Sequence, residues 1–315
     1  MNSPILVAYC PKTDESSTIA FAAAAARLTG APMTVVSVHP GGSVFDRLSG
    51  GEFEPHAEAL EPGLVDRLQT EIAAYDVPAE ARVVEHSTPA RGIAATIEEL
   101  QPRLVVLGSS HRGRLGRVLP GSTAERVIHG APCPVVVVPH GHAMPAGGLR
   151  SVGAAFVPTD EGRTALRVAA QLARAAGARL LAVTVLSPKH AEEQAPGLMA
   201  ASTRDQDPSE NRYARHRLVA EDTLEAAIAQ VSEGVVTEQD VLFQDPVEGL
   251  TAASHRVDLL VIGSRAYGPL HAVMLGGVSR RVMVEAACPV LVLPRGAEAA
   301  ADALGAKAEA DATPG

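Results

Sequence analysis

Aromatic residues, cysteines and long apolar runs are all scarce in this chain, and each shortage excludes a class of protein. Aromatic residues make up 3% of the sequence and tryptophan is absent, so the cores must be packed from aliphatic side chains. The three cysteines are too few and too widely spaced for a disulfide framework or a paired-cysteine metal site, which favours a reducing cytoplasm. No apolar segment approaches the ~20 residues that cross a bilayer, so no membrane partner is expected.

Basic residues are in the minority, with 27 lysines and arginines against 36 aspartates and glutamates and a formal net charge of -9. Sequence-independent binding of nucleic acid requires a basic face, so nucleic acid is not an expected partner. One loop departs from this balance, because it contains Arg112, Arg114 and Arg117. These arginines belong either to a solvated surface or to a local anion site.

Short apolar runs rich in β-branched residues alternate with helical segments along the chain. With 315 residues, of which 46% are hydrophobic, the chain is long enough for two domains. Strands that alternate with helices predict a parallel sheet covered on both faces. The expected strands are 5–9, 33–38, 81–85, 104–107, 134–138, 152–156, 180–185, 236–243, 259–262 and 289–293. The expected helices are 17–28, 64–75, 89–100, 122–129, 161–176, 213–231 and two that begin after Pro246 and after Gly277.

This order of elements occurs twice, with a regular spacing between matching residues. Tyr9 and Phe156 are 147 positions apart, and Gly108 and Gly263 are 155 positions apart. The change of offset indicates two copies of one domain that differ in the length of a loop. We expect a first domain over 1–139, a glycine- and proline-containing linker over 140–149, a second domain over 150–295 and a disordered tail over 296–315.

The stretch from Val105 to Ser122 is typical of a buried strand, a glycine-rich loop and the start of a helix. Ser122 followed by Glu125 predicts a capping box, in which the serine caps the helix and the glutamate reaches back to its N-terminus. A flexible loop before a helix N-terminus is also a common binding site for phosphate. Both roles stay open for Ser122, because they use the same end of the helix. A weaker copy of the stretch runs from 260 to 277.

These residues resemble the tandem form of the universal stress protein family over both repeats. Gly108-Ser109 and Gly121-Ser122 stand at the family's spacing, and the run Ala131–Pro134 returns as Ala287–Pro289. The resemblance implies an α/β protein with two tandem, doubly wound, five-stranded parallel-sheet domains, similar to adenine nucleotide alpha hydrolases and Rossmann-like. It also implies that the two fifth strands meet in an internal pseudo-dimer, and it allows a further homodimer.

The nucleotide-binding members of that family carry a glycine, two residues, a second glycine, nine residues, a third glycine and then a serine or threonine. An aspartate ends their first strand, and the end of their second strand offers backbone contacts to adenine. In the first repeat, the positions to which the resemblance assigns nucleotide contacts are Val38, Gly108, His111, Gly121 and Ser122. Two positions depart from the family, because His111 replaces the middle glycine and Cys10 replaces the aspartate.

In the second repeat the resemblance assigns nucleotide contacts to Gly263 and Gly276. Here Ala266 replaces the middle glycine, Gly277 the hydroxyl residue and Val157 the aspartate. A side chain at the middle position impedes a close approach of the backbone to phosphate. Loss of the aspartate removes a hydrogen-bond acceptor for the sugar or the base. We therefore expect ATP to bind weakly or not at all, and any phosphate-bearing ligand to occupy the first repeat.

Taken together, these features predict a non-enzymatic regulatory or protective protein of the stress response, with degenerate nucleotide-binding sites. The alternative is an ATP-binding switch that hydrolyses ATP slowly. An adenylate-forming transferase of a related α/β family is a third class, and its motifs are absent from the sequence. No catalytic residue and no metal ligand is assigned, since no triad order, carboxylate pair or metal-ligand motif stands out.

Overall fold

The computed structural model describes residues 3–11, 13–40, 63–109, 122–187, 208–264 and 276–294. In the first repeat these residues form β1 (Ile5–Tyr9), α1 (Ser16–Thr29), β2 (Met33–Pro40), α3 (Leu64–Ala73), β3 (Ala79–His86), α4 (Pro89–Leu100), β4 (Leu104–Gly108), α5 (Ser122–Ile128) and β5 (Val135–Val138). In the second repeat they form β6 (Ser151–Ala155), α6 (Asp160–Ala176), β7 (Arg179–Leu186), α8 (Pro208–Ala229), β8 (Thr237–Phe243), α9 (Pro246–Ser254), β9 (Leu259–Gly263), α10 (Gly277–Glu285) and β10 (Val290–Leu293).

Local signals explain where most helices begin and end. α1 and α6 each end at a glycine in the left-handed region, Gly30 with φ 65° and Gly177 with φ 63°. Thr88 precedes α4, and its Oγ1 accepts a hydrogen bond from the backbone nitrogen of Arg91 at 3.4 Å. One boundary was predicted wrongly, because α8 begins at Pro208 whereas the sequence predicts a helix that begins at residue 213. Proline suits the first turn of a helix, so the helix starts at this residue.

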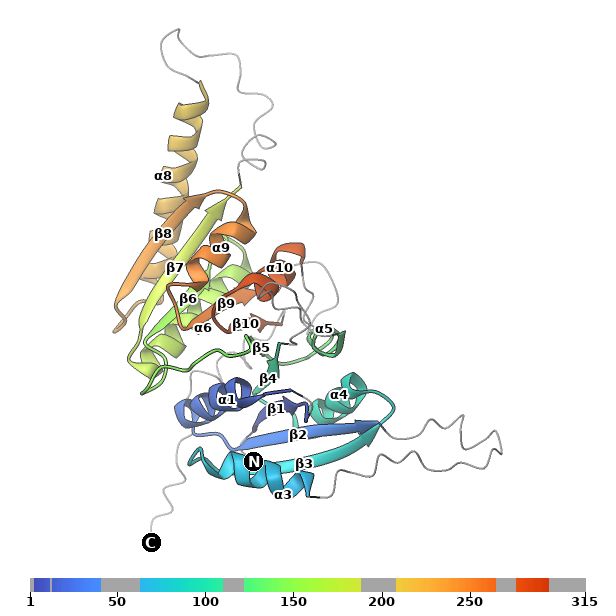
Figure 1. Ribbon diagram of the computed structural model, residues 1–315. Helices are drawn as coiled ribbons and strands as arrows, with labels where there is room; N and C mark the ends of the chain where they lie inside the picture. Colours follow the sequence, from blue (N-terminus) through green and yellow to red (C-terminus); the bar gives the residue numbers. More distant parts are fainter. Residues whose placement is uncertain are drawn as a thin grey trace, which may run out of the picture.

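Within the described residues, ten strands form one sheet in the order β3-β2-β1-β4-β5-β10-β9-β6-β7-β8. Neighbouring strands of the same repeat are parallel, and β5 pairs with β10 in the antiparallel direction. The two fifth strands therefore lie side by side at the middle of the sheet (Figure 1). The predicted α/β fold class and the internal pseudo-dimer are confirmed.

A pseudo-two-fold axis passes through the β5–β10 junction. Val136 pairs with Leu291, and these residues occupy equivalent positions in the two repeats. A residue that faces its own counterpart marks a two-fold axis. The same holds for Glu125 and Arg280, whose Oε1 and Nε atoms are 2.7 Å apart. Oε1 of Glu125 thus pairs with a guanidinium of α10, and the capping-box role predicted for Glu125 stays a prediction.

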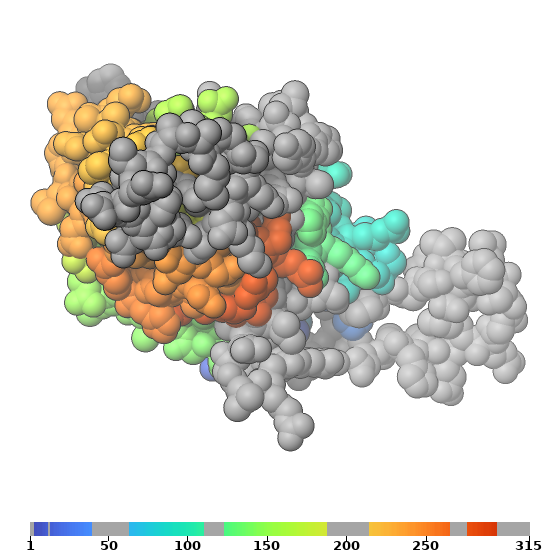
Figure 2. All heavy atoms as spheres, turned by 90° about the horizontal axis from the view of Figure 1, so that it is seen from above, coloured from blue at the N-terminus to red at the C-terminus, as the bar shows by residue number. Residues whose placement is uncertain are grey.

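Helices cover both faces of the sheet and enclose two cores that each extend through both repeats. α1, α3, α6 and α8 pack on one face, and α4, α5, α9 and α10 pack on the other. β5 illustrates the arrangement, since Val136 and Val138 face the first core whereas Val135 and Val137 face the second. Burial on both faces explains why the strands are uninterrupted apolar runs. Seen from above, the yellow and orange elements of the second repeat lie on the left and the cyan elements of the first repeat lie on the right (Figure 2).

Residues 140–149 form a connection that packs against both repeats. The backbone nitrogen of His140 donates to Oγ of Ser109 at 2.8 Å, and Met144 and Leu149 contact the first core. We propose these residues as the boundary between the domains, since the repeated order of elements starts again directly after them. The predicted tail, 296–315, lies outside the described residues. In the part of the chain that is described, no helix has both the length and the apolar character needed to cross a membrane.

Candidate functional site: two crevices at opposite ends of the sheet

Each half of the sheet reverses its strand order once, beside its first strand. β1 lies between β2 and β4, and β6 lies between β7 and β9. Ligands of doubly wound sheets bind at such a reversal, beyond the carboxyl ends of the strands. We call the carboxyl ends of β1 and β4 the first crevice, and those of β6 and β9 the second crevice. Because β5 and β10 are antiparallel, the two crevices open at opposite ends of the sheet.

The carboxylate of Glu15 occupies the first crevice. A methyl group added at Gly108, the last residue of β4, would collide with Oε2 of Glu15 and would lie 2.7 Å from Oγ1 of Thr18. Two hydrogen bonds hold the carboxylate in place, because Oγ1 of Thr13 donates to Oε1 and Oγ1 of Thr18 donates to Oε2, each at 2.7 Å. An acidic side chain therefore stands over the glycine at which the resemblance implies a nucleotide contact.

Burial makes this carboxyl group less acidic. Desolvation raises the pKa of Glu15 above its ordinary value, while the hydrogen bonds from Thr13 and Thr18 and the charge of His140 act in the opposite direction. His140 is near because its backbone nitrogen is bonded to Ser109, which directly follows β4. The start of the linker is thus part of the wall of the first crevice.

Val38 lies at the carboxyl end of β2, with its side chain packed against α4. A methyl group added at Gly92 would lie 2.6 Å from Cγ1 and 2.8 Å from Cγ2 of Val38. The second repeat has the same contact, with Gly249 of α9 against Val185 at 2.8 Å and 2.9 Å. Val38 is half-buried, and the backbone contact to adenine that the resemblance implies for it stays a prediction.

The two packing glycines are functional-site supports that the sequence analysis missed. Gly92 and Gly249 each stand three residues after the proline that opens their helix, Pro89 and Pro246. A glycine inside a helix costs stability unless close packing requires it. The repeated proline-x-x-glycine pattern was therefore the signal that could have identified both residues.

In the second crevice, the backbone and Cβ of Glu161 lie over the glycine that ends β9. A methyl group added at Gly263 would lie 2.8 Å from the backbone oxygen and 3.0 Å from Cβ of Glu161. Glu161 and Asp160 form an acidic first turn of α6. Oγ1 of Thr159 accepts a hydrogen bond from the backbone nitrogen of Gly162 at 3.2 Å and fixes this turn. The first turn of α6, which contains two acidic residues, thus lies over Gly263.

The remaining predicted residues are at the starts of α10 and α5. Gly276 is the buried N-cap of α10 and supplies no side-chain cap. No atom of the described residues lies within 4 Å of the place that a methyl group would take at Gly277, where the family's hydroxyl residue is missing. Ser122 is the first residue of α5, and the position of its side chain is not described. Outside the described residues lie His111, Arg112, Arg114, Arg117, Gly121, Arg265 and Ala266.

The cysteines and the metal-ligating residue types form no reactive cluster in the described part of the chain. Cys10 is exposed just after β1, whereas Cys133 and Cys288 are buried. Burial raises the pKa of each buried thiol to about 12, so both stay protonated and unreactive at neutral pH. The described residues contain no group of three or more histidine, cysteine, aspartate or glutamate residues that could hold a metal ion.

Several known proteins resemble this chain in sequence or in fold. A universal stress protein of Mycobacterium tuberculosis H37Rv is 29% identical over 222 residues, which cover 66% of this chain and 70% of the relative. The solved structure of a universal stress protein from Archaeoglobus fulgidus DSM 4304 matches with a TM-score of 0.60 and 17% identity, covering 92% of this chain and 98% of its own. A functionally unknown protein from Pseudomonas aeruginosa PAO1 matches with a TM-score of 0.64 and 16% identity, covering 96% of each chain.

The two solved structures share the fold of this chain. The family model described as "Universal stress protein family" matches residues 1–139 and again residues 150–294. The chain therefore belongs to the universal stress protein family and contains two copies of its domain in tandem.

Proposed function

We propose that this protein is a non-enzymatic universal stress protein with a regulatory or protective role, and that neither crevice holds a nucleotide tightly. The observation behind this proposal is the Glu15 carboxylate over Gly108 in the first crevice. In the second crevice the acidic first turn of α6 takes the same place over Gly263. A polyphosphate would therefore meet negative charge at either end of the sheet.

Electrostatics decide which part of a nucleotide is disfavoured. Glu15 is partly removed from water, so its repulsion of a nearby phosphate is screened less than on an open surface. Adenine and its sugar carry no charge, so the repulsion acts on the phosphates alone. We expect a dissociation constant for ATP above about 1 μM, which corresponds to less than about 8 kcal/mol of binding free energy.

An ATP-binding switch with slow hydrolysis is the second candidate, and Glu15 is also the observation that favours it. Cys10 stands where the family's nucleotide-binding members have an aspartate, and Glu15 brings a carboxylate into the same crevice. A carboxylate accepts hydrogen bonds from hydroxyl groups. Under this second proposal Glu15 replaces the missing aspartate and holds the sugar of an adenine nucleotide.

Isothermal titration of ATP and of adenosine into the protein and its Glu15→Gln variant separates the two proposals. If the carboxylate repels phosphates, the variant binds ATP more tightly and binds adenosine as before. If the carboxylate holds the sugar, the variant loses affinity for both ligands. Glu98→Gln is the matched control, since Glu98 is exposed on α4 and away from the crevice. Submicromolar ATP binding by the unaltered protein, or ATP hydrolysis in a radiolabelled assay, would overturn the non-enzymatic proposal.

We also propose that any phosphate-bearing ligand prefers the first crevice and that the protein resides in the cytoplasm. The preference for the first crevice is supported by Ser122, which begins α5. The matching position at the start of α10 is Gly277, which has no hydroxyl group. Gly277→Ser tests it, because no described residue would clash with the new side chain and the added hydroxyl should increase the number of ATP equivalents bound. The three unpaired cysteines support a reducing compartment.

A further inference from the structure

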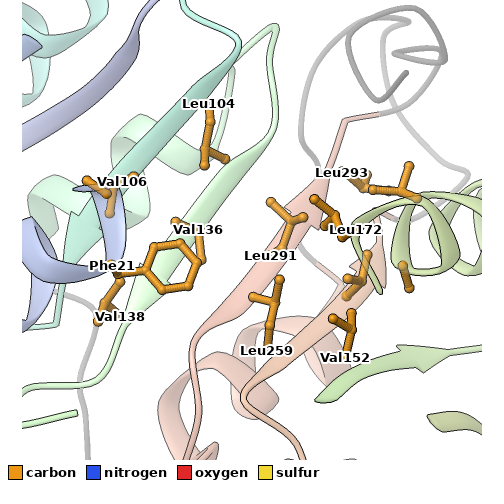
Figure 3. Packing of buried hydrophobic residues seen from close by; sticks show 14 of the residues in the cluster. Phe21, Leu104, Val106, Val136, Val138, Val152, Leu172, Leu259, Leu291 and Leu293 are labelled. Carbon is orange, nitrogen blue, oxygen red and sulfur yellow. The ribbon is translucent and has the colours of Figure 1, made fainter. Parts of the chain in front are cut away.

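A cavity of about 560 Å³ lies on the pseudo-two-fold axis, on the face of the sheet opposite the Glu125–Arg280 pair. Its floor is formed by Leu104, Val136, Leu291 and Leu259, which belong to four consecutive strands of the sheet, β4, β5, β10 and β9. Figure 3 shows these four side chains between Phe21 of α1 and Leu172 of α6. We call this space the axial cavity.

The fold itself leaves the axial cavity open. α1 packs on β1 and β4, and α6 packs on β6 and β9, so none of the described helices lies centrally over β5 and β10 on this face. Residues 144–149 of the linker form the remaining wall. The facing positions of the two helices carry small side chains, including Ala24 and Ala25 on α1 and Ala175 and Ala176 on α6. Larger side chains at these positions would fill the space.

One cation lines this otherwise mostly apolar cavity. Arg27 is exposed at the end of α1, and within the described residues its one hydrogen bond runs from Nη1 to the backbone oxygen of Tyr75 at 2.8 Å. Its counterpart in the second repeat is Arg174, whose Nε and Nη2 donate to the backbone oxygens of Glu233 and Val231. Arg174 is thus engaged and does not line the cavity, whereas Arg27 lines it and keeps donors available.

We propose that the axial cavity binds an aliphatic carboxylic acid, with the hydrocarbon chain over the floor of leucine and valine and the carboxylate on Arg27. The volume is within the range of pockets that bind small molecules, and such pockets combine apolar walls with a few polar groups. A single guanidinium matches a single carboxylate in a two-pronged pair. Among the described residues, the walls contain two aromatic side chains, Phe21 and Tyr75, so they suit a flexible chain better than a stack of flat rings.

Decanoate and decanol are the probes that test this proposal, because they share a chain length and differ in charge. The protein lacks tryptophan, so Tyr75→Trp places a single fluorescent reporter at the wall of the cavity. We expect decanoate to shift the emission to shorter wavelength and to saturate at one equivalent. Decanol should bind about tenfold more weakly or worse, since it lacks the charge-assisted bond. A thermal-shift titration of the unaltered protein repeats the measurement without the reporter.

Two pairs of variants locate the site. Arg27→Gln should bring the affinity for decanoate down to that for decanol, whereas Arg91→Gln, on α4 of the opposite face, should change neither. Filling the cavity with Ala24→Leu and Ala176→Leu should abolish binding of both probes, whereas Ala226→Leu, exposed on α8, should not. The proposal is overturned if decanoate does not saturate, if decanol binds equally well, or if the filled variant retains binding.

Discussion

The Glu125 carboxylate and the Arg280 guanidinium, 2.7 Å apart, occupy the same position in the two repeats. In a symmetric dimer of identical chains, a position on the axis meets a second copy of itself, and two glutamates or two arginines would repel. A tandem chain is free of this restriction, because each repeat can change alone. At this position, where identical chains would bring two like charges together, the tandem chain has an ion pair that attracts α5 to α10.

Reversing one charge of this pair should destabilise the protein slightly. Glu125→Arg faces Arg280 with a like charge, and we expect a loss of about 0.2–1 kcal/mol because both side chains are partly exposed and water screens the pair. The exchange Glu125→Arg with Arg280→Glu should restore stability. Urea unfolding of the unaltered protein, the two single variants Glu125→Arg and Arg280→Glu, and the double variant measures the coupling energy at low and high salt. A coupling energy of zero at low salt would show that the pair does not hold the repeats together.

A second prediction concerns the junction of the two half-sheets. Leu291 is 2% exposed beside Val136, so Leu291→Ala should cost about 2–5 kcal/mol, near the lower end because one side of Leu291 faces the axial cavity. Leu218 on α8 is 59% exposed, so Leu218→Ala should change stability by less than about 0.5 kcal/mol. Chemical denaturation measures both. Equal effects of the two substitutions would contradict the assignment of Leu291 to the shared core.

Much of the fold could be predicted from the sequence because its strands are short apolar runs bounded by turn residues. The run Val135–Val138 is buried on both faces, and this burial is what removes any polar alternation from its sequence. The pairing of β5 with β10 does not follow from the periodicity of the sequence. An apolar strand at the edge of a five-stranded sheet predicts that another segment covers that edge, but it does not predict which segment does so. The family resemblance supplied that contact.

The candidate site was less predictable, because its key residue acts across a long separation in sequence. Thr13, Glu15 and Thr18 are close neighbours, so their mutual hydrogen bonds are local. The position of the carboxylate over Gly108 depends on how the loop after β1 folds across β4, which no spacing within the loop reveals. The family's motif places its acidic residue at position 10, where this chain has Cys10. The carboxylate that reaches the crevice belongs to Glu15, five residues later.

Gly92→Ala should lower stability even though alanine favours helices. The gain in helix propensity is about 1 kcal/mol, whereas overpacking against Val38 costs about 1–3 kcal/mol. The double variant Gly92→Ala, Val38→Ala relieves the clash, so its loss should be smaller than the sum of the two single losses. Thermal unfolding of the set measures this non-additivity. Strictly additive losses would mean that α4 moves away from Val38 without cost.

Glu15 should make stability fall as the pH rises. The unfolded chain releases this proton near the ordinary glutamate pKa of about 4.3, and the native protein releases it at a higher pH because burial raises the pKa. Between these two pH values the native state binds more protons than the unfolded state, so stability decreases with increasing pH. In Glu15→Gln this contribution should disappear, and Glu98→Gln should keep it. Unfolding free energies measured from pH 4 upward test the difference.

His142 should act in the opposite pH direction. Burial lowers its pKa, and the nearby Asp258 and a hydrogen bond with the backbone of Ala287 only partly offset this. Below the ordinary histidine pKa of about 6.5 the unfolded chain binds a proton at this histidine, whereas the native protein binds it only at lower pH. The unfolded state therefore binds more protons, and stability falls on acidification. His142→Gln should reduce this loss, whereas His129→Gln, at an exposed position, should not. Identical pH profiles for the two variants would contradict the prediction.

The pairing of β5 with β10 within one chain also fixes how the protein responds to dilution. A dimer of separate chains follows mass action and comes apart when its concentration falls below the dissociation constant. Here the partner strand is tethered by a short connection, so its effective concentration is set by the chain and not by the cell. The two halves stay assembled at any level of expression, from the first molecules made at the onset of synthesis to the last that remain.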